Sequence, residues 1–311
     1  MHIGIVVNPR AGGNRRNPEV PERLRRVLAG RGTVAVPRSL DELDRAAEDF
    51  RRQGVTMVGI AGGDGTNHVT ITRFASVYGD APLPTFAFLR GGTMNTVANS
   101  LGLPRGRPER ILDRLVVAAL DRPTIAFVER PTLDVGGKLG FLWGMGVVSG
   151  FLKAYYDTGA PSPWTAAKTL ARGIGSTLTR GEYVRQMTEP AVARVTVDGE
   201  RWSPETFLAL AAATIPDIGL GFRPFHKAAE LDDRFHMLGI MASPLGFVLD
   251  LPRIHRALPM REGKAIDAPA RVVTVETGGA SCSMMIDGDL VEHPGPSVTI
   301  RVGPTVRIAT A

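Results

Sequence analysis

The chain has 311 residues, of which 43% are hydrophobic and 22% charged, a balance typical of a folded globular protein with room for two domains. Its one cysteine, Cys282, excludes an intramolecular disulfide, and no apolar run approaches the roughly 20 residues that a transmembrane helix needs. The N-terminus lacks the basic and apolar regions of a signal peptide, so we expect a cytoplasmic protein. A net charge of +6 suits anionic partners such as nucleotides, acidic lipids or nucleic acid, without separating them.

Short apolar strands alternate with helices in the first third of the chain. The expected strands cover residues 3–7, 34–36, 56–60 and 84–89, and the expected helices cover 21–28, 40–53, 67–78 and 108–120, with a further helix that begins near Thr93. Ser39 and Glu42 form a capping-box pattern at the start of the second helix. This alternation predicts an open α/β sheet that binds ligands at the carboxyl ends of its strands.

Three glycine-containing loops directly follow three of these strands. They read Asn8-Pro9-Arg10-Ala11-Gly12-Gly13, Gly62-Gly63-Asp64-Gly65-Thr66 and Arg90-Gly91-Gly92-Thr93-Met94-Asn95. Glycines permit unusual backbone conformations and the close approach of a bulky anion, and N–H groups before a helix form a phosphate site. A carboxylate such as Asp64 would repel phosphates unless it holds Mg²⁺ or accepts a proton, as phosphoryl transfer requires. The alternative is a tight strand-to-helix turn without a ligand.

The sequence changes character near residues 122–123, after which many short β-rich runs follow. They cover 124–128, 132–135, 139–143, 192–197, 206–213, 235–241, 272–276, 283–286, 298–302 and 305–308, with helical insertions near 151–180 and 245–258. Asp198-Gly199 and Asp287-Gly288 predict hairpin turns. We therefore expect an α/β domain over residues 1–123 and a mostly antiparallel, β-sandwich-like domain over 124–302. We expect the last strand, at about 303–311, to return to the first domain.

Residues 144–150 nearly match a dinucleotide-binding fingerprint. No acidic residue follows about 20 positions later, and the segment is not a clean βαβ unit. Close packing of a strand against a helix is the better interpretation of these glycines.

The three loops together resemble the diacylglycerol-kinase catalytic family, which includes bacterial lipid kinases and sphingosine and ceramide kinases. Leu101-Gly102-Leu103-Pro104 resembles the segment that follows the third loop in that family, and residues 219–224, 232–236 and 286–289 resemble its later motifs more loosely. The resemblance implies a nucleotide-binding domain with a Rossmann-like or phosphofructokinase-like open sheet, and a lipid alcohol that enters between the two domains. It implies that ATP contacts Asn8, Pro9, Arg10, Gly12, Gly62, Gly63, Gly65, Thr66, Gly92, Thr93 and Asn95.

The same resemblance implies two catalytic carboxylates, Asp64 and Asp287. One would accept the proton of the lipid hydroxyl and the other would help to hold Mg²⁺, and the sequence leaves open which does which. An ordinary hairpin turn is the alternative for Asp287. A metal role is also implied for Asp289, Asp232 and Asp233, with a solvated acidic turn as the alternative for the last two. The expected cations that offset the phosphates are Arg10, Arg15 and Arg90.

Several positions depart from the family pattern. Arg90 stands where a proline is usual, Thr96 where an aspartate is, and Asn99 where an arginine is. The residues after the second loop, 67–69, lack the usual acidic side chain, and Arg234 replaces a glycine. These changes leave the acceptor open and keep a regulatory lipid- or nucleotide-binding protein with a degenerate kinase site as an alternative. An NAD kinase is a further alternative, against which the absence of an Asn-Glu pair argues.

The expected function is phosphate transfer from ATP to a diacylglycerol-like lipid in phospholipid biosynthesis, at the cytoplasmic face of a membrane. Two segments could lie on an anionic membrane surface or simply cover a core: residues 245–256, and a segment carrying Tyr155, Tyr156, Trp164, Lys168, Arg172 and Arg180. No motif supports binding to nucleic acid. A homodimer stays open.

Overall fold

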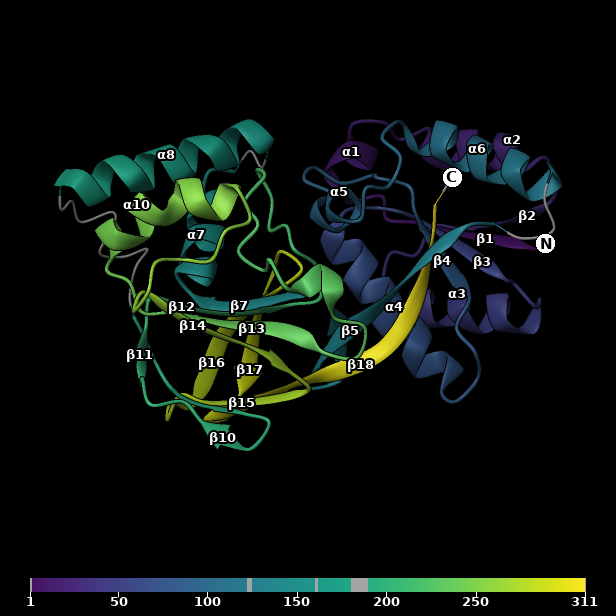
Figure 1. The fold of residues 1–311 in the computed structure, drawn as a ribbon. Coiled ribbons are helices and arrows are strands. Elements are labelled where there is room, and N and C mark those ends of the chain that lie inside the picture. Colours follow the sequence, from purple (N-terminus) through teal and green to yellow (C-terminus); the bar gives the residue numbers. More distant parts are fainter. Residues whose placement is uncertain (1, 122–124, 160–161, 180–189, 311) are drawn as a thin grey trace. The chain divides into compact units, whose positions relative to one another are not determined.

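The computed structural model describes residues 2–121, 125–159, 162–179 and 190–310. The chain divides into two compact units (Figure 1): residues 1–130 with 305–311 form the first, and 131–304 form the second. The domain boundary predicted at residues 123/124 and the predicted surface residue Arg180 lie outside the described residues.

The first unit is built on a parallel sheet in the order β2-β1-β3-β4-β18, which confirms the open α/β sheet that the sequence predicts. Its strands are β1 (Ile3–Val7), β2 (Gly32–Ala35), β3 (Met57–Ala61), β4 (Thr85–Phe88) and the end of β18 (Ser297–Ala309). The connecting helices are α1 (Gly12–Arg15), α2 (Val20–Leu28), α3 (Leu40–Arg52), α4 (Asp64–Tyr78), α5 (Thr96–Ser100) and α6 (Pro108–Asp121). Ile308 of β18 pairs with Phe86 of β4, so the predicted return of the last strand is confirmed.

Helices cover both faces of this sheet (Figure 1). α2 and α6 pack on one face, where Leu24 and Leu112 are fully buried in an aliphatic cluster. α3 and α4 pack on the other face through aromatic side chains, with the Phe74 ring centroid 6.2 Å from that of Phe50 and 6.0 Å from that of Phe86. This burial of both faces explains the nearly continuous apolar sequence of β1 and β3.

Two helix starts differ from the prediction. α4 begins at Asp64, three residues before the predicted start, so Asp64, Gly65 and Thr66 form its first turn. α5 begins at Thr96 because Asn95 adopts a left-handed conformation, with φ of 50°, which interrupts the helix expected near Thr93. Ser39 caps α3 as predicted and accepts a hydrogen bond from the Glu42 N–H, at 3.2 Å.

The second unit contains a six-stranded antiparallel sheet in the order β14-β13-β12-β7-β16-β17. These strands are β7 (Leu142–Gly146), β12 (Ala209–Ala213), β13 (Phe235–Ile240), β14 (Ala265–Ala270), β16 (Ser281–Ile286) and β17 (Asp289–Pro294). Facing it are β9 (Arg194–Val197), β10 (Glu200–Arg201), β15 (Val272–Glu276) and the start of β18, with β5 (Phe127–Val135) and β6 (Lys138–Gly140). A separate pair is formed by β8 (Ala191–Val192) and β11 (Thr206–Phe207).

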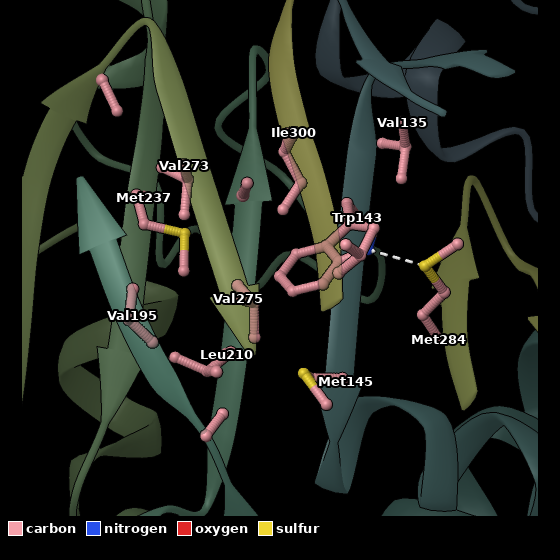
Figure 2. Close-up of a cluster of buried hydrophobic side chains, with 14 of the residues drawn as sticks. Val135, Trp143, Met145, Val195, Leu210, Met237, Val273, Val275, Met284 and Ile300 are labelled. Atoms are coloured by element: carbon pink, nitrogen blue, oxygen red, sulfur yellow. Dashed lines mark hydrogen bonds between the residues drawn. The ribbon is translucent and has the colours of Figure 1, made fainter. Parts of the chain in front are cut away.

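The core of the second unit is apolar and draws side chains from both sheets (Figure 2). Trp143 of β7 is fully buried there, and its indole N–H points at the sulfur of Met284, 3.1 Å away. Val195, Val273 and Ile300 enter the same core from β9, β15 and β18. The predicted β-sandwich-like domain is therefore confirmed.

Some strand boundaries in the second half were predicted wrongly. β5 and β18 are each one strand, where the sequence predicts a break near Pro131 and Pro304. β14 and β17 were missed, because proline and charged residues hide the apolar alternation in them. Both lie at the edges of the six-stranded sheet, where a strand needs neither a full hydrogen-bond ladder nor two apolar faces.

The helices of the second unit are α7 (Val147–Tyr156), α8 (Pro163–Thr179) and α10 (Pro244–His255), with a 3₁₀ turn at Ala228–Glu230. α7 packs against β7, β12 and β16, and α8 contacts both α7 and α10. The glycines of residues 144–150 serve this packing, as predicted: a Cβ on Gly144 would lie 2.8 Å from Val148 of α7. Among the described residues, none of the helices has the length and apolar character to cross a membrane.

Candidate functional site

Three loops converge at the carboxyl edge of the first unit's sheet, because β1, β3 and β4 are neighbours in it. The Asn8 N–H donates to the Ala61 carbonyl at 3.1 Å, and the Gly13 N–H donates to the Gly91 carbonyl at 3.0 Å. All residues predicted to contact the nucleotide lie in these loops or in the first turns of α1 and α4. The point between β1 and β3, where the order of the sheet reverses, is where open α/β sheets generally bind ligands.

Two asparagines hold the first loop against the second. The Asn8 side-chain amide donates to the Thr66 hydroxyl at 2.9 Å. The Asn14 amide donates to the main-chain carbonyls of Asn8, at 2.9 Å, and Ala61, at 2.7 Å. Asn14 is only 3% exposed, and sequence reasoning missed this role. No motif marked it, since an asparagine in a polar loop is usually just solvated.

The glycines of the three loops are needed because the loops touch one another. A Cβ on Gly92 would lie 2.2 Å from the Cα of Gly63, and a Cβ on Gly13 would lie 2.7 Å from the Gly91 carbonyl oxygen. The expectation that Gly62, Gly63 and Gly65 adopt conformations closed to other residues is wrong, because none of them has a positive φ, and neither does Gly13, Gly91 or Gly92. Their common property is the missing Cβ, which lets the loops meet backbone to backbone.

Asp64 lies at the junction of the second and third loops. One carboxylate oxygen accepts the N–H of Thr96, at 2.8 Å, and the other accepts the N–H of Val97, at 3.0 Å. Asp64 therefore caps the first turn of α5 while it occupies the first turn of α4. Burial raises the pKa of Asp64 above its usual range, and the two N–H bonds and the charge of Arg90 oppose this rise.

The Arg90 side chain stabilises the third loop through hydrogen bonds to the segment that follows it. Its guanidinium donates to the Asn99 side-chain oxygen at 2.7 Å and to the carbonyls of Ala98, at 3.2 Å, and Leu103, at 2.6 Å. Its backbone is left-handed, with φ of 54°, a strained conformation for a side chain with a Cβ. Burial lowers the pKa of Arg90. Arg90 and Asn99, two departures from the family pattern, are thus direct partners.

The loops keep polar groups that a ligand could use. Among the residues that the structure describes, the N–H groups of Gly63, Gly92 and Thr93 have no protein acceptor. They lie beside the N-terminus of α4, where a helix carries a partial positive charge. The side chains of Arg10 and Arg15 are exposed at the same edge. Unpaired N–H groups, a helix N-terminus and exposed guanidinium groups are the features of a phosphate site.

Asp287 lies in the second unit, at the turn between β16 and β17. Its carboxylate is 3% exposed and accepts the N–H groups of Phe141, at 2.9 Å, and Leu142, at 2.8 Å. Asp198, in the other Asp-Gly hairpin, is bonded in the same way: it accepts the N–H groups of Arg271 and Val272, at 2.9 and 2.8 Å. Both aspartates have a left-handed backbone, with φ of 45° and 48°. Both predicted hairpin turns are confirmed.

The other predicted metal residues also lie in the second unit. Asp232 and Asp233 are exposed in the turn before β13, and Asp233 forms ion pairs with Arg271 and Arg234. Asp289 is the first residue of β17 and is partly buried. Within the described part of the chain, no group of three or more His, Cys, Asp or Glu side chains is placed to hold a metal ion.

Comparisons with known proteins agree with the family suggested by the three loops. Residues 2–126 match the family model of the diacylglycerol kinase catalytic domain. No curated protein matches the chain. The recognition made from the sequence is therefore confirmed for residues 2–126, the part of the chain that this family model matches.

Three solved structures share the fold of the whole chain. A "putative diacylglycerol kinase" from Bacillus anthracis strain Sterne is 17% identical with a TM-score of 0.72, and covers 100% of this chain and 97% of its own. A diacylglycerol kinase from the same organism is 15% identical with a TM-score of 0.66 and the same coverage. Yeast NADH kinase, solved with NADH, is 11% identical with a TM-score of 0.51 over 100% of this chain and 83% of its own.

Proposed function

We propose that the protein is an ATP-dependent lipid kinase that transfers the γ-phosphate to the hydroxyl group of a diacylglycerol-like lipid. The observation that carries the proposal is the convergence of the three loops on Asp64 within the matched kinase domain. Nucleotide phosphates would lie against the N–H groups of Gly63, Gly92 and Thr93 and the N-terminus of α4. Arg10 and Arg15 would offset the phosphate charge.

In the proposed reaction, the lipid hydroxyl oxygen forms a bond to the γ-phosphorus while the bond from that phosphorus to the bridging oxygen of ADP breaks. The hydroxyl proton passes to a carboxylate base, and the products are ADP and a phosphorylated lipid. Asp64 is suited to this chemistry, because its two N–H partners hold the carboxylate in one orientation and burial raises its pKa, which makes it a stronger base than an exposed aspartate.

The residues present fit a magnesium ion that is shared with the nucleotide. Mg²⁺ in kinases is usually bound through one or two carboxylates together with substrate phosphates, rather than by a cage of protein ligands. Asp64 offers such a carboxylate at the three loops and would take this role where Asp287 is the residue that accepts the proton. When bound, the ion would neutralise charge that develops on the phosphates. Asp287 stays a predicted second carboxylate, and its similarity to Asp198 makes the two residues a matched pair for testing.

Phosphate transfer from labelled ATP tests the proposal directly. The acceptors would be a panel of lipid alcohols in mixed micelles with Mg²⁺, and NAD in a parallel reaction. Label on one lipid class that disappears in the D64N variant would support the proposal and name the lipid class. Label on NAD would instead support the NAD kinase alternative, for which the shared fold is the specific observation. Nucleotide binding without transfer would support the degenerate, regulatory alternative.

A further inference from the structure

The two segments that the sequence marks for membrane contact are neighbours in the second unit. One forms α10, and the described part of the other forms α8 and the end of α7; α8 and α10 contact each other (Figure 1). Tyr155, which the sequence places on the same surface, is buried. Ser162 caps α8 by accepting the Thr165 N–H at 2.9 Å, and Ser243 caps α10 by accepting the Gly246 N–H at 3.2 Å. Each helix therefore has a hydrogen-bonded cap at its N-terminus.

Large apolar side chains remain exposed on these helices and beside them. Trp164 of α8 is 79% exposed, and Leu245 and Leu249 of α10 are 46% and 54% exposed. Tyr156 at the end of α7 and Leu258 just after α10 are also exposed. A single exposed apolar residue is ordinary, but several on adjoining helices indicate an interaction site.

The exposed positions of each helix follow its turns. On α8, Trp164, Lys168 and Arg172 recur every fourth residue and are exposed, whereas Ala166 and Thr169 between them are buried. On α10, Leu245 and Leu249 have the same spacing, and Arg256 follows at the end of the helix. Each helix thus buries one side and presents to solvent a stripe that combines apolar and basic groups.

Neither helix contributes an exposed acidic side chain to its own stripe among the described residues. α8 contains no Asp or Glu, and the one acidic residue of α10, Asp250, is fully buried and paired with Arg261 at 3.2 Å. Exposed tryptophan and leucine beside lysine and arginine match the boundary of an anionic bilayer, where aromatic rings lie at headgroup depth and cations meet lipid phosphates.

We propose that these stripes on α8 and α10 form a docking surface for an anionic phospholipid membrane. The inference rests on the proposed lipid kinase function only for its purpose, since a lipid hydroxyl would be reached at a bilayer. The docking itself requires neither nucleotide nor catalysis.

Tryptophan fluorescence can report binding at this surface. Of its three tryptophans, Trp143 and Trp202 are buried, at 0% and 8% exposure, so a change in tryptophan emission on binding reports Trp164. The experiment titrates the full chain with phosphatidylcholine vesicles, with and without phosphatidylglycerol, and measures emission and flotation. We expect a blue shift and co-flotation with the anionic vesicles that weaken as salt is added.

Matched charge reversals decide where the vesicles bind. K168E/R172E should weaken binding about tenfold or more, since each cation near an anionic surface contributes roughly a fivefold effect. R26E/R45E makes the same change in total charge at exposed positions on α2 and α3 and should leave binding unchanged.

Equal losses of vesicle binding in both variants, or vesicle binding without a blue shift, would overturn the proposal. A blue shift that depends on protein concentration without vesicles would overturn it in favour of a second copy of the chain as the partner.

These results are separable from those on catalysis. If the wild-type chain binds anionic vesicles through this surface but transfers no phosphate, the docking proposal stands and the kinase proposal fails. If it phosphorylates lipid in micelles but ignores vesicles, the reverse holds.

Discussion

Asp64 in the first unit and Asp287 in the second both accept two backbone N–H groups, yet their surroundings differ. Asp64 joins two glycine loops at a sheet edge that also carries unpaired N–H groups. Asp287 joins a hairpin turn to the start of β7, and Asp198 makes the same connection to β15. Asp198 is exposed and Asp287 is buried, yet both make the same hairpin contacts, so these backbone bonds alone do not distinguish a catalytic aspartate from a structural one.

The largest effect should come from Asp64→Asn. The variant removes the charge and the proton acceptor while keeping the size of the side chain, so we expect kcat to fall about 10³-fold, within the usual contribution of a general base. Steady-state phosphate transfer measures the rate, and calorimetry measures ATP binding. Asp198→Asn is the control, and its activity should follow only its folded fraction. A D64N enzyme as active as the D198N enzyme would remove Asp64 from the proposed reaction.

The next effect should come from Gly92→Ala, which tests whether loop contact is what the glycines provide. The new Cβ would meet the Cα of Gly63 at 2.2 Å, so the loops must separate. We expect a loss of about 1–3 kcal/mol of unfolding free energy, as for other overpacked sites, and weaker ATP binding. Urea denaturation and calorimetry provide the readouts.

Gly175→Ala is the control for this glycine, since a Cβ there on α8 would meet nothing within 4 Å. It should raise stability slightly, because alanine favours a helix over glycine. Equal behaviour of the two alanine variants would show that the loops are not in contact.

Asp287→Asn and Asp198→Asn compare the two hairpin aspartates of the second unit. Each variant keeps one side-chain oxygen for the N–H groups and replaces the other with an amide that cannot accept an N–H. We expect Asp287→Asn, at a buried position, to lose about 1–3 kcal/mol of unfolding free energy, and Asp198→Asn, at an exposed position, to lose less. If Asp287 acts only on the fold, both variants should keep kcat per folded molecule. A selective loss of kcat in D287N, with ATP binding intact, would give Asp287 the catalytic role predicted from the sequence.

The smallest effect should come from Arg90→Gln, which tests the electrostatic coupling of Arg90 to Asp64. The charge of Arg90 lowers the pKa of Asp64, so its removal should raise that pKa further. Because the base must be ionised, the acid limb of the kcat profile should move to higher pH. Arg107→Gln, at an exposed position, should leave the profile in place. An R90Q profile that overlays the wild type would show that Arg90 only braces the loop.

The sequence predicted the open α/β sheet and the three loops because each depends on neighbouring residues: an apolar strand, then glycines, then a helix. It could not predict Asn14, whose partners, Asn8 and Ala61, are brought to it by the fold. The Arg90–Asn99 contact could not be predicted for the same reason, since each residue taken alone is only a departure from the family pattern. Edge strands such as β14 were missed because their pairing comes from a neighbour rather than from their own pattern.

Hydrogen–deuterium exchange of the full chain with and without ATP and Mg²⁺ tests the central claim most directly, because it locates nucleotide binding without assuming catalysis. The account predicts that exchange slows in peptides that cover residues 8–14, 62–67 and 91–97. It predicts little change in the glycine segment at 144–150, whose glycines serve packing. Slower exchange at 144–150 with no change in the three loops would contradict the proposed nucleotide site.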